Sequence, residues 1–244
     1  MTASVRSAFT LVPKIDEARL QEAFAESRVV QIAPFLAGDA AADLLAHLGG
    51  RDDWTRLIKA AAAEPFEHKL ADPAISAAQL KGLEVLAAPV ADSGFRYIYD
   101  RIAAIGPDGD ARETGTLLSQ AAAFLSGADM RAVLHAITGI QTGFADAQAT
   151  RYGPGQFLTL HHDSEVRSQR RLAYVLSLSE GWRPEWGGLL LFHDEAGEVI
   201  RGFVPRMNAL TIFSVPRDHS VSQVASFAPR PRYSITGWFH GAQP

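Results

Sequence analysis

The sequence predicts an α+β fold, mainly β, in which a helical first half packs against an antiparallel β sandwich or barrel. Helical periodicity dominates the first 140 residues, whereas from about Phe144 the chain changes to short alternating segments separated by Gly, Pro, Asp and Asn. No internal repeat or low-complexity linker separates the two halves. We therefore expect residues 1–244 to form a single domain, with 1–143 as a mainly helical support region and 144–244 as the core.

The first half begins with an amphipathic helix over 15–27, because its apolar residues recur at helical spacing and its first turn is acidic. A strand over 28–32 and a helix over 40–48, stopped by Gly49-Gly50, follow it. No group of chemically reactive side chains gathers in this half. The remaining helices are expected over 75–88, 95–105, 114–125 and 130–137.

The second half is expected to contain eight short strands, because alternating apolar and polar residues are repeatedly interrupted by turn residues. Residues 194–197 and 205–208 have the composition of hairpin connections. The expected strands cover 145–151, 157–163, 172–178, 188–193, 199–204, 209–214, 219–224 and 233–239.

Composition excludes several classes of protein. The 244 residues contain no cysteine, which rules out disulfide scaffolds, thiolate zinc sites, iron–sulfur clusters and cysteine nucleophiles. No run of about 18 apolar residues occurs, so we expect a cytoplasmic protein without a membrane segment. Residues 151–244 carry ten arginines, no lysine and eight acidic residues. The net positive charge of this half is too small to predict direct binding to nucleic acid.

The sequence His161-His162-Asp163 ends one of the expected strands. Because side chains alternate between the faces of a strand, His161 and Asp163 point the same way and His162 points to the other side. A same-face His and Asp supply two of the three ligands in the facial triad of non-haem Fe(II). A register slip of one residue would exchange His161 for His162.

The third ligand of such a site must be a histidine from another segment. His193, His219 and His240 follow later in the chain. His219 is the strongest candidate because it opens the expected strand 219–224, which a barrel can bring opposite the first strand. His193 precedes a hairpin tip, and His240 follows the last expected strand.

An arginine opens the last strand-like segment, in which Arg232, Ser234, Thr236 and Trp238 share one face. A guanidinium that points into a small barrel is costly unless an anion pairs with it, and it binds carboxylates in a bidentate manner. We therefore expect a dicarboxylate that chelates the metal at one end and meets Arg232 at the other, as 2-oxoglutarate can. An ion pair with a buried Asp or Glu is the alternative role for Arg232.

The ordered series of these motifs resembles the Fe(II)/2-oxoglutarate oxygenases of the prolyl-hydroxylase superfamily. The ending Ser-Ile-Thr-Gly-Trp-Phe-His-Gly, residues 234–241, is most similar to the branch that hydroxylates a proline of a small-subunit ribosomal protein. The resemblance covers roughly residues 150–241. Its motifs are Tyr152-Gly-Pro-Gly, His161-x-Asp163, Arg170-Arg171-Leu-Ala-Tyr, Trp186-Gly-Gly, Asn208-Ala-Leu-Thr, His219-Ser-Val-Ser and Arg232-Tyr-Ser-Ile.

The resemblance implies a double-stranded β-helix (jelly roll) with supporting N-terminal helices, so that 144–244 would be a jelly-roll catalytic core. It implies iron on His161, Asp163 and His219, and 2-oxoglutarate anchored by Arg232. Tyr152 would lie in the cosubstrate or substrate pocket, with Thr236 and Trp238 beside the cosubstrate. Ser177 stands where the family often has a tyrosine that touches the far carboxylate. Tyr174, on the same expected strand, faces the other way by alternation.

The resemblance also implies an activity. Family enzymes use Fe(II), 2-oxoglutarate and O2 to hydroxylate a C–H bond, and they release succinate and CO2; ascorbate is a further candidate cofactor. The implied substrate is a prolyl residue in a protein, such as a ribosomal protein or a translation factor, although related barrels also oxidise small molecules. Two alternatives remain open: a cupin-like metalloenzyme that does not use 2-oxoglutarate, and a catalytically silent jelly-roll binding domain.

Overall fold

The structure is a computed structural model, and it describes residues 9–61, 63–88, 94–164 and 169–241. Its helices are α1 (Glu17–Ser27), α2 (Ala40–Gly49), α3 (Ala77–Ala87), α4 (Leu117–Leu125), α5 (Ala128–Thr138) and the short 3-10 helix η1 (Pro184–Trp186). Its strands are β1 (Val29–Ile32), β2 (Thr55–Lys59), β3 (Phe66–Lys69), β4 (Tyr97–Ile105), β5 (Ala147–Tyr152), β6 (Phe157–His161), β7 (Arg170–Leu178), β8 (Leu190–His193), β9 (Val199–Phe203), β10 (Met207–Ser214), β11 (His219–Val221) and β12 (Arg232–His240).

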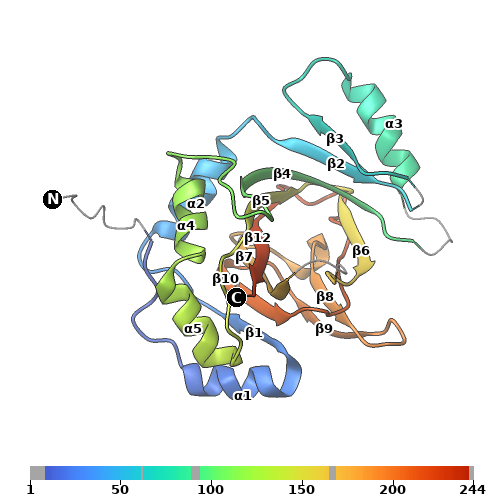
Figure 1. The fold of residues 1–244 in the computed structure, drawn as a ribbon. Coiled ribbons are helices and arrows are strands. Elements are labelled where there is room, and N and C mark those ends of the chain that lie inside the picture. The colour runs from blue at the N-terminus through green and yellow to red at the C-terminus, as the bar shows by residue number, and fades with distance from the viewer. Residues whose placement is uncertain (1–8, 62, 89–93, 165–168, 242–244) are drawn as a thin grey trace.

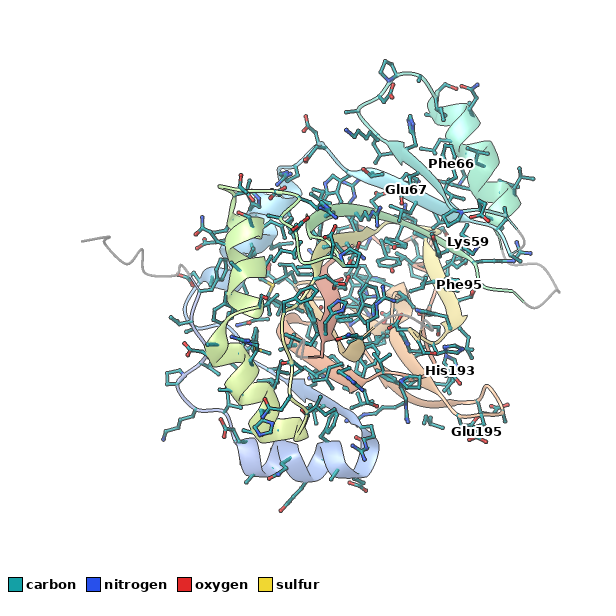
Figure 2. All side chains as sticks on the ribbon, in the orientation of Figure 1. Lys59, Phe66, Glu67, Phe95, His193 and Glu195 are labelled. Atoms are coloured by element: carbon teal, nitrogen blue, oxygen red, sulfur yellow. The ribbon has the colours of Figure 1, made fainter. Side chains whose placement is uncertain are left out.

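The strands form one curled antiparallel sheet, the double-stranded β-helix that the motif series implies (Figure 1). The strand order is β1-β10-β7-β12-β5-β4-β6-β11-β8-β9, and the hairpin of β2 and β3 joins the sheet through β4. Strands that are distant in sequence are therefore neighbours, and β6 pairs with β11. In the view of Figure 2, Glu67 of β3 and Glu195 after β8 lie on opposite sides of the barrel, with Phe95 between them.

Four helices, α1, α2, α4 and α5, cover one face of the sheet, whereas α3 lies apart with the β2–β3 hairpin (Figure 1). Buried side chains from these helices join the main core, including Phe24 of α1, Leu44 of α2 and Leu134 of α5. They share this core with Tyr174 of β7 and Phe239 of β12. Full burial of one such side chain contributes about 1.5–3 kcal/mol. The helices thus fix one face of β7 and β12 and leave the opposite face for a cavity.

The helices begin where the sequence supplies capping side chains. The Asp16 carboxylate accepts a hydrogen bond from the Arg19 backbone N–H at the start of α1. Capping boxes begin α3 at Ser76 and α4 at Thr116. The helix predictions over 15–27, 40–48, 75–88, 114–125 and 130–137 are confirmed to within three residues at each end.

The predicted helix over 95–105 is wrong, because this segment is β4. Its buried residues, Ile98, Asp100, Ile102 and Ala104, recur with period two. Apolar residues at 95, 98, 102 and 105 also fit a helical period, but pairing with β2, β5 and β6 decides the structure. The buried Asp100 carboxylate bonds to Arg56 of β2 and Arg151 of β5, partners that only the folded sheet supplies.

The other strand predictions are confirmed, with shifts of a few residues at their ends. Residues 194–197 do connect a hairpin, since β8 pairs with β9. Residues 205–208 do not, because β10 pairs with β7 and β1 rather than with β9. The sequence analysis also missed β2 and β3. Within the described part of the chain, no helix has the length and apolar character needed to cross a membrane.

Candidate metal centre and its cavity

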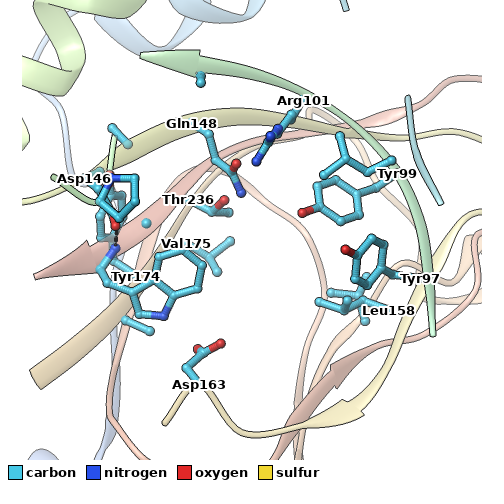
Figure 3. Close-up of a pocket in the computed structure, with 18 of the residues that line it drawn as sticks. Tyr97, Tyr99, Arg101, Asp146, Gln148, Leu158, Asp163, Tyr174, Val175 and Thr236 are labelled. Carbon is cyan, nitrogen blue, oxygen red and sulfur yellow. Dashed lines mark hydrogen bonds between the residues drawn. The ribbon is translucent and has the colours of Figure 1, made fainter. Parts of the chain in front are cut away.

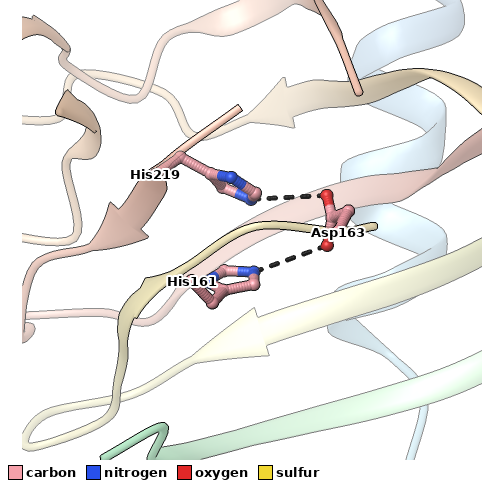
Figure 4. Close-up of side chains that lie close together, drawn as sticks. All are labelled: His161, Asp163 and His219. Carbon is pink, nitrogen blue, oxygen red and sulfur yellow. Dashed lines mark ion pairs between the residues drawn. The ribbon is translucent and has the colours of Figure 1, made fainter. Parts of the chain in front are cut away.

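Three predicted ligands meet where β6 and β11 pair. His161 is the last residue of β6 and His219 the first of β11, and the register sets these two residues opposite each other. Asp163 follows His161 by two residues and returns to the same side (Figure 4). The Nε2 atoms of His161 and His219 lie 3.5 and 3.6 Å from the two Asp163 carboxylate oxygens. One ligand atom from each residue lies within 4.8 Å of the other two.

Backbone carbonyls orient both imidazoles. The His161 Nδ1–H donates to the Thr159 carbonyl at 2.9 Å, and the His219 Nδ1–H donates to the Arg217 carbonyl at 2.8 Å. Because a carbonyl oxygen can only accept, each Nδ1 carries the proton and each Nε2 keeps a free lone pair. Both lone pairs lie on the Asp163 side, as metal coordination requires.

Burial keeps the cluster in the protonation state of a metal site. Desolvation, reinforced by the neighbouring His161, lowers the pKa of His219 to about 4, so its imidazole is neutral at pH 7. Burial alone would raise the pKa of Asp163, but His161 and His219 outweigh this effect and hold that pKa below its ordinary value. The neutral imidazole of His219 and the carboxylate of Asp163 are thus available together.

His162 lies outside this cluster. Its Nδ1 contacts the hydroxyl of Ser164 at 2.6 Å on the exposed side of the chain. The other histidines considered as third ligands are also engaged elsewhere. His193 contacts the Ser220 hydroxyl at 2.8 Å, and His240 contacts the Asp146 carboxylate at 3.0 Å.

A cavity of about 670 Å³ lies beside the three residues. Its walls come from β4, β5, β6, β7 and β12, on the sheet face opposite the main core. Figure 3 shows Gln148, Thr236 and Tyr99 projecting into this space across from Asp163. The cavity is therefore large enough for a small dicarboxylate together with part of a second molecule.

Arg232 forms part of the cavity wall and is only 2% exposed. Its Nε and Nη1 atoms have no hydrogen-bond partner in the described part of the chain, and no acidic side chain there forms an ion pair with it. Its guanidinium lies 5.3 Å from the centre of the Tyr152 ring. Burial lowers the pKa of Arg232 from its ordinary value. The alternative role, an ion pair with a buried acid, is thus not seen among the described residues.

The remaining predicted site residues divide into two groups. Thr236 and Trp238 line the cavity with Arg232, as their shared face of β12 predicts. Tyr152 and Ser177 are buried but do not line it. The Ser177 hydroxyl accepts a hydrogen bond from the Arg206 backbone N–H at 3.0 Å. The Tyr174 hydroxyl donates to the Asp146 carbonyl at 2.9 Å and so does not replace the family tyrosine.

One wall of the cavity was not predicted from the sequence, because the segment of β4 was expected to be helical. Tyr97, Tyr99 and Arg101 occupy alternate positions of β4 and line the cavity (Figure 3). Phe95, just before β4, stacks on the His161 ring with 4.7 Å between ring centres. The alternation of Tyr97, Tyr99 and Arg101 was the available signal, since period two places them on one face.

These residues fit an iron ion and 2-oxoglutarate. Two imidazole nitrogens and one carboxylate form the donor set typical of non-haem Fe(II) sites with open positions. Arg232, whose Nε and Nη1 have no partner among the described residues, supplies what an anionic cosubstrate requires, two buried N–H donors. A jelly roll with this cluster and this arginine has the features of a non-haem iron oxygenase.

Known proteins resemble this chain in both sequence and fold. Residues 147–240 match the model of the 2OG-Fe(II) oxygenase superfamily. The matched segment runs from β5 to β12 and contains the three clustered residues and Arg232. The match thus covers the β core, 94 of the 244 residues of this chain.

Two curated relatives share sequence with part of this chain. The prolyl 3-hydroxylase OGFOD1 of Mus musculus is 33% identical over 121 residues, and the prolyl 3-hydroxylase sudestada1 of Drosophila melanogaster is 31% identical over 123 residues. Each match covers 46% of this chain, but only 22% and 23% of the respective relatives. The match thus spans less than a quarter of either relative.

Solved structures show the same fold over nearly the whole chain. A prolyl-4-hydroxylase of Pseudomonas putida has a TM-score of 0.60 at 21% identity, covering 93% of this chain and 100% of its own. A prolyl hydroxylase of Trichoplax adhaerens, in complex with a hypoxia inducible factor peptide fragment, has a TM-score of 0.58 at 13% identity. That match covers 92% of this chain and 88% of the other.

Proposed function

We propose that this protein is an Fe(II)- and 2-oxoglutarate-dependent dioxygenase that hydroxylates a prolyl residue of a protein, with release of succinate and CO2. One observation carries the proposal: a buried arginine, two of whose nitrogens have no partner among the residues that the structure describes, shares a cavity with a His-His-Asp cluster. A cupin-like metalloenzyme without 2-oxoglutarate has no use for such an arginine. A silent binding domain has no use for either feature.

The residues divide into two binding roles. His161, Asp163 and His219 would hold the metal through two imidazole nitrogens and a carboxylate oxygen. Arg232 would hold the far carboxylate of 2-oxoglutarate in a dry environment, where a charge-assisted contact is strongest. The bound iron and cosubstrate would supply the oxidising chemistry, and the protein would orient the reactants and exclude water.

Thr236 lies on the same face of β12 as Arg232 and lines the cavity, so its hydroxyl is available to the cosubstrate. The Arg232 guanidinium lies over the Tyr152 ring, so Tyr152 packs against it and supports its position. Ser177 is already bonded to the backbone of Arg206, so we assign it no direct contact with the cosubstrate. The tyrosine that the family often places there has no counterpart on β7.

The substrate proposal rests on relatives that are named prolyl hydroxylases and on a fold neighbour bound to a peptide fragment. We propose a proline within a protein segment, with ribosomal proteins and translation factors as the first candidates and the cytoplasm as the compartment. The curated relatives are named 3-hydroxylases, whereas a fold neighbour is a 4-hydroxylase. The position of hydroxylation on the ring is therefore part of the test.

The cofactor chemistry can be tested without a substrate. Metal-free protein is mixed anaerobically with Fe(II) and then titrated with 2-oxoglutarate, while the visible spectrum is recorded for the charge-transfer band of an iron-chelated 2-oxo acid. We expect a saturable band in the wild type and a much weaker response in Arg232→Met at the same concentration. Tight Fe(II) binding without a band would favour the cupin-like alternative, and absence of Fe(II) binding would favour the silent domain.

The substrate can be tested with synthetic peptides that cover the proline-containing loops of ribosomal proteins and translation factors. We expect a mass gain of one oxygen on one peptide, dependent on Fe(II), O2 and 2-oxoglutarate, with ascorbate as an added variable. Hydrolysis and chromatography of the hydroxyproline then separate the 3- and 4-isomers. Oxidation of small molecules with no peptide product would overturn the protein substrate.

A further inference from the structure

The indole N–H of Trp238 is a buried donor without a partner. Its Nε1 atom is shielded from solvent and has no hydrogen-bond partner in the described part of the chain. A buried N–H without an acceptor is unfavourable, so its neighbours should show which acceptor it serves. Trp238 lines the cavity that contains the three clustered residues.

Asp163 lines the same cavity and is the candidate acceptor for this N–H. Arg170 contacts both residues, which places them near each other, and the indole also helps to hold the pKa of Asp163 below its ordinary value. Asp163 has two oxygens, one facing each histidine. A metal in a facial triad takes one oxygen if its other positions are to stay open, so the second oxygen needs a donor.

Arg170 contacts both Trp238 and Asp163. Its guanidinium lies over the Trp238 ring, 3.8 Å from the ring centre, and its Nη1–H donates to the Asp163 backbone carbonyl at 3.4 Å. A cation on the face of an indole is attracted to the ring and restricts its plane. Arg170 therefore ties the first residue of β7 to both the indole and the backbone of the acidic residue.

The backbone at Trp238 is itself anchored. The Trp238 N–H donates to the Asp146 carboxylate at 2.6 Å, and the Asp146 N–H donates to the Trp238 carbonyl at 3.1 Å. The other Asp146 oxygen lies 3.0 Å from the Nε2 of His240, so it accepts from that ring. At Gly237 a Cβ atom would lie 2.1 Å from the Asp146 carbonyl oxygen, so the close approach requires glycine.

We propose that Trp238 is a positioning residue that orients the Asp163 carboxylate for one-oxygen metal binding, with Arg170 holding the indole in place. This inference rests on the proposed metal site. It also changes the role that the family resemblance implies for Trp238. Six residues of strand, roughly 20 Å, separate Trp238 from Arg232, so the two cannot hold the same small carboxylate.

Metal titration tests this role without turnover or substrate. Metal-free wild type, Trp238→Phe and Trp54→Phe are each titrated with Co(II), with the visible absorption of the bound ion as the readout. Trp54→Phe is a matched control, because the Trp54 N–H donates to the Arg51 carbonyl at 3.0 Å and the residue does not line the cavity. We expect the Kd of Trp238→Phe to rise about 10–100-fold, with altered band intensity. Trp54→Phe should bind as the wild type does.

A second variant covers the case in which Trp238→Phe folds poorly. Arg170→Met keeps a long apolar side chain over the indole but removes its charge and its donor to Asp163. We expect a smaller increase in Kd, of the same sign, with an altered Co(II) spectrum. Thermal melts of the metal-free variants show which proteins are folded.

The outcomes separate this inference from the proposed function. Wild-type affinity and an unchanged spectrum in folded Trp238→Phe, or in folded Arg170→Met if the first variant does not fold, would overturn the positioning role alone. Absence of Co(II) binding by the wild type would overturn the proposed metal site and this inference with it. Weakened binding in Trp54→Phe as well would show a general effect of indole removal and would also overturn the inference.

Discussion

His161 and His219 are cross-strand partners, with their ring centres 4.1 Å apart although 58 residues separate them in sequence. The pairing of β6 with β11 thus builds two thirds of the cluster, and Asp163 completes it from the same strand end. Each ring is held by the carbonyl of the residue two positions earlier in the chain. The site is therefore formed by the sheet before any ligand binds.

Removing one histidine at a time should distinguish a metal-binding histidine from an adjacent histidine that does not bind the metal. We expect His219→Ala to lose roughly two orders of magnitude or more in Co(II) affinity, a larger effect than that of any outer residue. His162→Ala is the matched control, because His162 is adjacent to the cluster but faces Ser164. Calorimetric titration measures both. Equal losses in the two variants would mean that the strand register differs in solution.

Arg232 should reduce the stability of the protein when no anion is bound. A buried, unpaired guanidinium carries a desolvation cost, and replacing buried charges by apolar residues often stabilises proteins by about 1–4 kcal/mol. We expect Arg232→Met to unfold at higher urea concentration than the wild type when 2-oxoglutarate is absent. With metal already present in both samples, added 2-oxoglutarate should stabilise the wild type only. A less stable Arg232→Met would show that the arginine has a structural partner.

The sequence indicated the site more reliably than the scaffold around it. Alternation along two strands placed His161 with Asp163, and Arg232 with Thr236 and Trp238, because period two is a local property. The conformation of β4 could not be read locally, because its apolar residues fit both periods and its buried Asp100 depends on arginines from two other strands. The strands that pair with β10 could not be predicted from the sequence either, because a jelly roll pairs strands that are distant in sequence.

Asp100 should therefore be important for folding. Its carboxylate is 2% exposed and bonds to Arg56 and Arg151, so Asp100→Asn leaves the partly buried Arg151 without this anion and Arg56 with Glu84 as its acidic partner. We expect a loss of roughly 3–5 kcal/mol in the free energy of unfolding, measured by urea denaturation. The control is Glu67→Gln, which breaks the more exposed pair with Arg101 and should cost only about 0–1 kcal/mol. Similar losses would contradict the role assigned to the buried cluster.

The metal-free protein should lose stability as the pH falls below neutrality. The pKa of His219 is about 4 in the folded protein and about 6.5 when the chain is unfolded, so between these values the unfolded state binds the extra proton. The lowered pKa of Asp163 acts in the same direction at more acidic pH, because the unfolded carboxyl protonates first. The shift of His219 alone corresponds to roughly 3 kcal/mol between pH 7 and pH 4. Urea denaturation in the presence of a chelator should give this slope for the wild type and a flatter one for His219→Gln. A wild-type curve that is flat from pH 7 to pH 5 would show that His219 is not buried as a neutral imidazole.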